Sequence, residues 1–221
     1  MSTLQDYLYL TQQLLRDANN RFFSVQYLTL CINNARDKVV VDTLTTRTLP
    51  RIALVPNQES YSYQTILAAI LTESPTPAAR QVATILNVNF NQTSSLNPPL
   101  RRMAWSDFNR IFRVSPLNSF PLAWSQYDLA STIYIHPLIP ATGYTAEIDC
   151  VYLPVKMVNT TDQETTIPDP VTELVPFFAA FWATQYEQDA TRAAGFSANY
   201  ETLKDYMLAS MPPWSVMNRY T

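Results

Sequence analysis

"IPDPVTELVPFFAAFWATQY", residues 167–186, contains the hydrophobic run that decides the fold class of this chain. Asp169 as N-cap and Pro170 as first helical residue are favourable helix starts, whereas Pro176 should kink or restart the helix. The run is apolar on nearly every side, which is typical of a helix that neighbouring elements bury from several directions. It therefore predicts a helix buried inside a bundle.

The next segment supplies one neighbour, a helix that should end near residue 210, where Met-Pro-Pro-Trp begins. An apolar stripe runs along it, formed by Ala193, Phe196, Tyr200, Leu203 and Met207. The preceding helix presents the small residues Ala179, Ala180 and Ala183, which permit close approach.

The first third of the chain supplies the other neighbours. Helical periodicity predicts one helix over 3–17, with Ser2 and Gln5 as a capping box, and a second over about 25–45 with Ser24 as N-cap. Pairing the terminal helices buries their stripes, so 1–48 and 171–210 should form one helical domain. We expect its core to centre on Leu28, Ile32, Phe178, Trp182 and Tyr200, with Trp182→Ala costing about 3–5 kcal/mol.

Between these helices, residues 49–170 are mostly β-rich and alternate between polar and apolar positions. A short helix near 104–113 should be the one interruption, because Trp105, Phe108 and Phe112 fall at helical spacing. The fold class is thus α+β, a helical bundle with an inserted β-sandwich or barrel-like lobe. Residues 157–170 should be a polar loop.

Two carboxylates in the strand-like segment 144–152 are the first candidates for chemistry. Alternation places Glu147 and Asp149 on one face, where they could form a glycosidase-like pair or a metal site. The interpretation we favour is a strand face open to solvent, a neighbouring subunit or a partner.

His136 is the single histidine and could be a general base, but no motif supplies orienting partners for it. The glycines at 143 and 195 are the only two, which excludes a phosphate loop or a dinucleotide fingerprint. The acidic residues of 162–173 are dense without the spacing of a calcium loop; they are Asp162, Glu164, Asp169 and Glu173. We expect no catalytic residue, metal or cofactor.

Four arginines, Arg101, Arg102, Arg110 and Arg113, are interleaved with aromatic residues. They could stack on bases or contact phosphates. Helical spacing favours aromatics that face the core and arginines that meet solvent or the acids of a neighbour.

Charge is distributed unevenly along the chain. Residues 1–127 hold 11 Lys or Arg and 7 Asp or Glu, whereas 128–205 hold 3 and 11, and the pI of about 5.1 argues against a generic nucleic-acid binder. Cys31 and Cys150 sit among apolar residues, as buried free thiols in a reducing cytosol do. The N-terminus lacks a basic leader, and no run approaches the length of a membrane span.

Several segments, taken in order, resemble the head-to-tail adaptor (connector) proteins of tailed bacteriophages, especially short-tailed ones. They are LLRDANNRFFSVQYLTLCINNARDKVVVDTLT, MAWSDFNRIFRVSPLNSFPLAWS, IYIHP, EIDCVYLP, IPDPVTELVPFFAAFWA and ANYETLKDY. The resemblance implies a non-enzymatic virion protein in the neck, assembled in the host cytoplasm as a twelve-subunit ring between portal and tail nozzle. Tail fibres or spikes are further partners, and genomic DNA would pass without sequence-specific contact.

Two other functions fit the residues. A tail-tube or nozzle protein would share the ring without the portal contact. A carbohydrate-binding or hydrolytic virion protein would use the β lobe with its Glu147 and Asp149.

The last segment, residues 211–221, reads MPPWSVMNRYT and should be an extended tail, because two prolines forbid helix continuation. Its apolar residues, Trp214, Val216, Met217 and Tyr220, are expected to anchor it on the portal or an adjacent subunit. The alternative is a tail that folds back over its own bundle.

Overall fold

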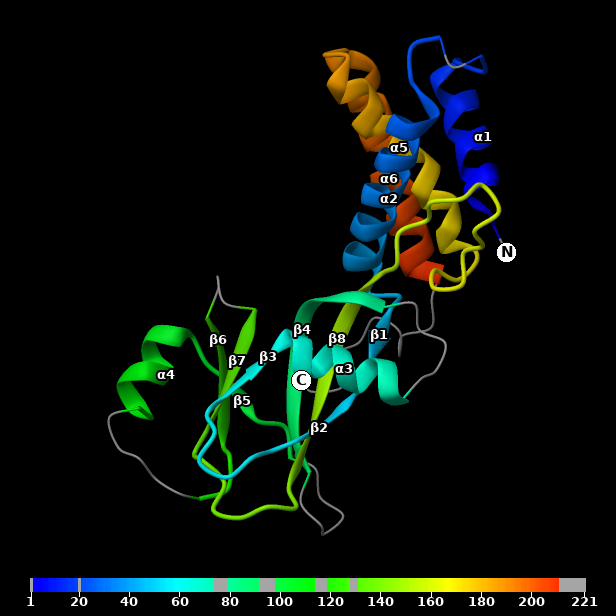
Figure 1. Ribbon diagram of the computed structural model, residues 1–221. Coiled ribbons are helices and arrows are strands. Elements are labelled where there is room, and N and C mark those ends of the chain that lie inside the picture. The colour runs from blue at the N-terminus through cyan, green and yellow to red at the C-terminus, as the bar shows by residue number, and fades with distance from the viewer. Residues whose placement is uncertain are drawn as a thin grey trace. The chain divides into compact units, whose positions relative to one another are not determined.

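The computed structural model describes residues 2–19, 21–73, 79–91, 98–113, 119–127 and 131–210 (Figure 1). The chain is α+β and divides into two compact units. The helical unit comprises residues 1–46 together with the chain from 153 onward, and the β unit comprises residues 47–152.

The helical unit is built around α5 (Leu174–Tyr186), which contacts α1 (Leu4–Leu15), α2 (Val25–Thr43) and α6 (Ala190–Ser210). Leu28 and Ile32 of α2 and Tyr200 of α6 are fully buried. The prediction of a bundle assembled from the two ends of the chain is therefore confirmed.

The helix starts depend on side-chain caps. Ser24 caps α2 as predicted, accepting the N–H of Tyr27 at 3.2 Å. The predicted box of Ser2 and Gln5 on α1 is wrong by one residue: Thr3 is the N-cap, and Thr3 and Asp6 form the reciprocal capping box. Threonine and aspartate offer the same chemistry one position later, and an acid in the first turn also suits the helix dipole.

The start of α5 differs from the prediction. Asp169 is not its N-cap; a 3₁₀ turn, η1 (Val171–Glu173), comes first, and Asp169 accepts a hydrogen bond from Thr172 Oγ1 at 2.6 Å. Pro176 is the third residue of α5, in the first turn, where a backbone N–H has no intrahelical acceptor. The helix therefore accommodates the proline without a break.

Trp182 corrects one expectation about the bundle core. Its side chain is 44% exposed, while Phe178, one turn earlier, is 8% exposed and lies 4.8 Å from Tyr200 between ring centroids. The opposite face of α5 is the buried one, and it carries Ala180 and Thr184, both fully buried. The expected cost of Trp182→Ala, which assumed burial, is accordingly too large.

The β unit contains two sheets. In the first, β8 (Thr145–Pro154) is central, with β1 (Arg47–Thr48) and β2 (Arg51–Ala53) antiparallel to it and β4 (Ala79–Asn91) also paired with it. The second has the order β3 (Ser60–Ser62), β7 (Thr132–His136), β6 (Ala123–Tyr127) and β5 (Arg101–Arg102), with only β5 and β6 parallel. In the described part of the chain the sheets do not close into a barrel.

Two helices accompany the sheets. The short helix predicted near 104–113 is α4 (Trp105–Ile111), which contacts β6. The sequence reasoning missed α3 (Tyr63–Glu73), which contacts β2 and β4 and buries Ile66 and Ile70. One core joins α3 to both sheets, with Trp124, Ile85, Ile133 and Ile148 among its members.

The segment 153–170, which the sequence analysis placed in the inserted lobe, lies with the helical unit. Its backbone bonds to the start of the chain, from Leu4 N to Asp162 O at 3.0 Å and from Glu164 N to Ser2 O at 2.8 Å. Asn33 of α2 accepts the N–H of Met157 at 2.9 Å. These long-range bonds have no signature in local sequence.

Candidate partner-binding surfaces

An arginine–aromatic cluster lies where α4 meets the second sheet. The ring of Trp105 lies 5.1 Å from that of Tyr127 and 4.5 Å from that of Tyr134. The Arg113 guanidinium lies 5.4 Å from the Trp105 ring centroid, and its Nε lies 3.2 Å from Glu59 Oε1. Arg113 is thus positioned by both a cation–π contact and an ion pair.

The other three predicted arginines are exposed in the same unit. Arg101 and Arg102 form β5 beside β6, which α4 contacts, and the Arg102 guanidinium lies 5.3 Å from the Trp124 ring centroid. Arg110 on α4 meets Asp107 at 3.5 Å, an exposed pair of little energetic weight. Phe108 is fully buried, so the prediction that its face of the helix packs inward is confirmed.

The carboxylates of β8 are not the open pair that we expected. Asp149 is 1% exposed and accepts from Arg47 Nε at 2.7 Å, and Glu147 accepts from Arg51 Nε at 2.8 Å. Antiparallel pairing causes this, because Arg51 lies opposite Glu147 and β1 pairs alongside Asp149. Both carboxylates are therefore held in ion pairs within the β unit.

His136 lies in an aromatic environment. It is 3% exposed, and the Phe112 and Phe108 ring centroids are 5.5 and 6.2 Å from its own. Its Nδ1 lies 4.0 Å from Glu59 Oε1, the carboxylate that Arg113 also contacts. His136, at the end of β7, is therefore buried against Phe108 and Phe112 and lies away from bulk solvent.

A buried ion pair in the helical unit had no sequence signal. Glu164 is 2% exposed and accepts from Arg36 Nε at 2.6 Å and from Arg36 Nη2 at 3.1 Å. Arg36 Nη1 also donates to the Val155 carbonyl at 2.8 Å. The pair therefore fastens the segment 153–170 to α2.

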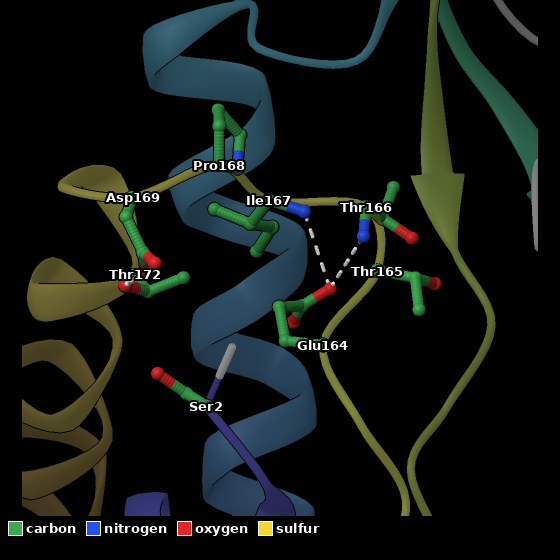
Figure 2. Close-up of a pocket in the computed structure, with 8 residues that line it drawn as sticks. All are labelled: Ser2, Glu164, Thr165, Thr166, Ile167, Pro168, Asp169 and Thr172. Carbon is green, nitrogen blue, oxygen red and sulfur yellow. Dashed lines mark hydrogen bonds between the residues drawn. The ribbon is translucent and has the colours of Figure 1, made fainter.

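A cavity of about 220 Å³ lies beside this pair, and Figure 2 shows its lining. Glu164 Oε1 accepts the backbone N–H groups of Thr166 at 3.0 Å and Ile167 at 3.2 Å, the dashed lines in the figure. Asp162 instead accepts the N–H groups of Val158 and Asn159, whose bonds lower the pKa of its carboxyl. Across the described residues, no group of three or more His, Cys, Asp or Glu could hold a metal ion.

Aromatic side chains that are exposed or partly exposed lie at one end of the bundle. Tyr27 near the start of α2 lies 5.1 Å from Tyr186 at the end of α5, and Tyr186 is 76% exposed. Trp182 stands one turn before Tyr186, and Phe22 in the α1–α2 connection is 77% exposed. We call Tyr27, Trp182 and Tyr186 the bundle-end patch; sequence reasoning missed it because helical periodicity assigned Trp182 to the core.

Two further expectations can be compared with the structure. Cys31 and Cys150 are buried free thiols as predicted, and burial raises the pKa of Cys150 to about 12.

No helix in the described ranges is long and apolar enough to span a membrane. The tail and its anchors Trp214, Val216, Met217 and Tyr220 lie outside the described residues.

The comparison with protein families decides the identity. The sequence model of the SU10 adaptor protein family matches residues 5–219, which include both units. The chain belongs to the SU10 adaptor protein family. A search of curated proteins gives no match. The adaptor is thus a structural protein of a bacteriophage, as the resemblance implied.

Proposed function

We propose that the adaptor forms a closed ring in the virion neck, between the portal and the tail nozzle, around the path of the genome. The observation that carries this proposal is the family match over residues 5–219, because it includes the helical unit and the inserted β unit together. The head-to-tail resemblance supplies the two neighbours and the twelve-subunit ring. Tail fibres or spikes are additional partners.

Charge supports contact between unlike surfaces. The helical unit carries 8 Lys or Arg and 12 Asp or Glu, a net charge of −4, whereas the β unit carries 7 and 6, a net of +1. The exposed arginines of β5 and α4 belong to the β unit. A contact between two different surfaces is heterologous, and it generates a ring when its rotation closes.

The predicted partner-binding residues do not all belong to the proposed interface. Arg101, Arg102, Arg110 and Arg113 are proposed to face the acids of a neighbour. Glu147 and Asp149 are already paired within the chain, so we leave them out of the interface. The tail anchors are proposed to bind outside their own bundle, on a neighbouring chain or the portal.

The test is electron microscopy of the purified adaptor mixed with its portal. We expect rings stacked on the portal, with density continuing from the portal channel. Rings that join a nozzle but never the portal would favour a tail-tube or nozzle role, and a lack of rings with either partner would overturn the proposal. Deleting residues 211–221 should leave helical circular dichroism unchanged and weaken association.

A further inference from the structure

The bundle-end patch is an unusual surface for an isolated bundle. Trp182 and Tyr186 are 44% and 76% exposed. Large aromatic side chains left in water mark interaction sites when they are contiguous. Contact of the Tyr27 and Tyr186 rings shows that the patch is continuous across α2 and α5.

The fold explains why these rings remain uncovered. Toward the other end of the bundle, Tyr200 Oη of α6 donates to Asp42 of α2 at 2.8 Å, and Phe178 is buried against Tyr200. At the patch end, Arg192 of α6 instead donates to the carbonyl of Leu15, at the end of α1. At this end α6 is bonded to α1, and Trp182 and Tyr186 of α5 stay exposed.

The sequence after α6 has the chemistry to cover such a surface. Residues 211–214 are Met-Pro-Pro-Trp, outside the described residues. Consecutive prolines favour a polyproline II conformation, which aromatic-lined surfaces bind at low entropic cost. Arg219 is the one charged residue of 211–221, and the exposed Glu187 adjoins the patch with opposite sign.

The Met-Pro-Pro-Trp segment is too short to reach the bundle-end patch of its own chain. α6 has 21 residues, a length of about 31 Å, and Figure 1 shows its orange start and red end at opposite ends of the bundle. Tyr186 lies at the end where α6 starts, because only residues 187–189 separate the two helices. Four residues beyond Ser210 extend at most about 14 Å, so Met-Pro-Pro-Trp falls short of Tyr186 and Tyr27.

We infer that the bundle-end patch of one adaptor copy binds the Met-Pro-Pro-Trp segment of a second copy. Trp214 packs against Trp182 and Tyr186, and the prolines lie on Tyr27. This inference rests on the proposed self-assembly, and it names the surface and the segment that make the contact. The contact is heterologous, so each copy offers one patch and one segment.

A peptide titration tests the contact directly. The receptor is full-chain Trp214→Ala protein, whose own segment lacks the anchor, and the probe is a fluorescein-labelled peptide of residues 211–221. We expect saturable 1:1 binding by fluorescence anisotropy, weakened at least tenfold by adding Tyr186→Ala to the receptor. The matched control adds Tyr206→Ala, a 73% exposed tyrosine near the other end of α6, and should bind like the parent.

Complementation provides a second readout. Full-chain Tyr186→Ala retains the segment and lacks part of the patch, whereas Trp214→Ala retains the patch and lacks the anchor. Each variant alone should self-associate at least tenfold more weakly than the natural chain in sedimentation velocity. Their mixture should form a 1:1 pair that does not grow, because each pair uses the one good segment and the one good patch.

The outcomes separate this contact from the ring proposal. Absent peptide binding, or equal binding to the Tyr186→Ala and Tyr206→Ala receptors, overturns the inference. If rings still join the portal in that case, the proposed function stands alone. If the peptide binds as expected but the natural chain forms no ring, the contact stands and the ring proposal fails.

Discussion

Arg36 and Glu164 form a buried ion pair that joins two distant parts of the sequence. They are 128 positions apart in the chain, yet their side chains are buried and joined by two hydrogen bonds. Arg36 also donates to Asn33 Oδ1 at 3.2 Å and to the carbonyl of Val155, and Glu164 also accepts the N–H of Thr166. Removal of one partner therefore leaves a buried charge without its complement.

Glu164→Ala should lower the free energy of unfolding of the helical unit by about 3–5 kcal/mol. Lys38→Ala is the matched control, because Lys38 pairs with Asp42 on the same helix α2 but is 46% exposed; it should cost less than about 1 kcal/mol. Urea unfolding followed by helical circular dichroism measures both. Equal losses in the two variants would show that the buried pair is not a main stabiliser.

The stabilisation that Asp17 provides should depend on pH. Burial raises the pKa of its carboxyl, but the N–H groups of Phe23, Arg21 and Phe22 bond to the charged form and outweigh burial, so the pKa is lowered overall. A folded-state pKa below the unfolded value means stabilisation that is present above about pH 4 and lost as the pH falls through the folded pKa.

Asp17→Asn should therefore destabilise the α1–α2 connection by about 1–3 kcal/mol at pH 7. Its difference from the natural chain should shrink as the pH falls below about 4. Thermal unfolding across this range provides the measurement, with the exposed Asp205→Asn as a charge-matched control. A difference that is constant with pH would mean that the charge of Asp17 does not cause the stabilisation.

At the scale of elements, α5 has two halves with different surroundings. Leu174, Val175, Pro176 and Phe178 are all buried in its first half, whereas Trp182 and Tyr186 are exposed in its second. The first half is enclosed by neighbouring elements, and the second leaves one side open. A helix that is apolar all round can thus be a core element at one end and expose aromatic rings at the other.

Phe178→Ala should cost about 3–5 kcal/mol, because it empties space against Tyr200. Trp182→Ala should cost less than about 2 kcal/mol, since nearly half of the ring is already in water. Melting temperatures of the two variants test the contrast. A Trp182→Ala loss as large as that of Phe178→Ala would show that the ring is buried in solution.

At the scale of the whole molecule, charge separates the two units. The helical unit has a net charge of −4 and the β unit +1. Some charged side chains form ion pairs within their own unit, as Arg47 and Asp149 do. Arg101 and Arg102 remain exposed on β5, where a neighbouring copy can reach them.

Self-association should consequently weaken as ionic strength rises from about 0.05 to 0.5 M, because exposed charges are screened over shorter distances. Light scattering at fixed protein concentration follows the change. Reversing Arg101 and Arg102 to Glu should remove much of the salt dependence while the melting temperature stays constant. Association that is insensitive to salt would assign the interface to apolar contacts such as the bundle-end patch.

What the sequence by itself determined is local. The stripe that includes Tyr200 and Met207, the cap at Ser24 and the short helix over Trp105 depend on neighbours within a few residues, so periodicity predicts them. The two-ended bundle followed from apolar stripes that need partners. Local pattern failed to predict α3, because a short apolar run fits a strand as well as a helix.

Only the tertiary structure decided which charged side chains are paired and which aromatic rings are buried. Asp149 is buried because β1 pairs beside it, Glu164 binds Arg36 from a distant part of the chain, and Trp182 is 44% exposed. Each outcome depends on segments far apart in sequence, and alternation or helical spacing reports only which face a side chain occupies. What covers that face is set by long-range packing, and the bundle-end patch is a surface for that reason.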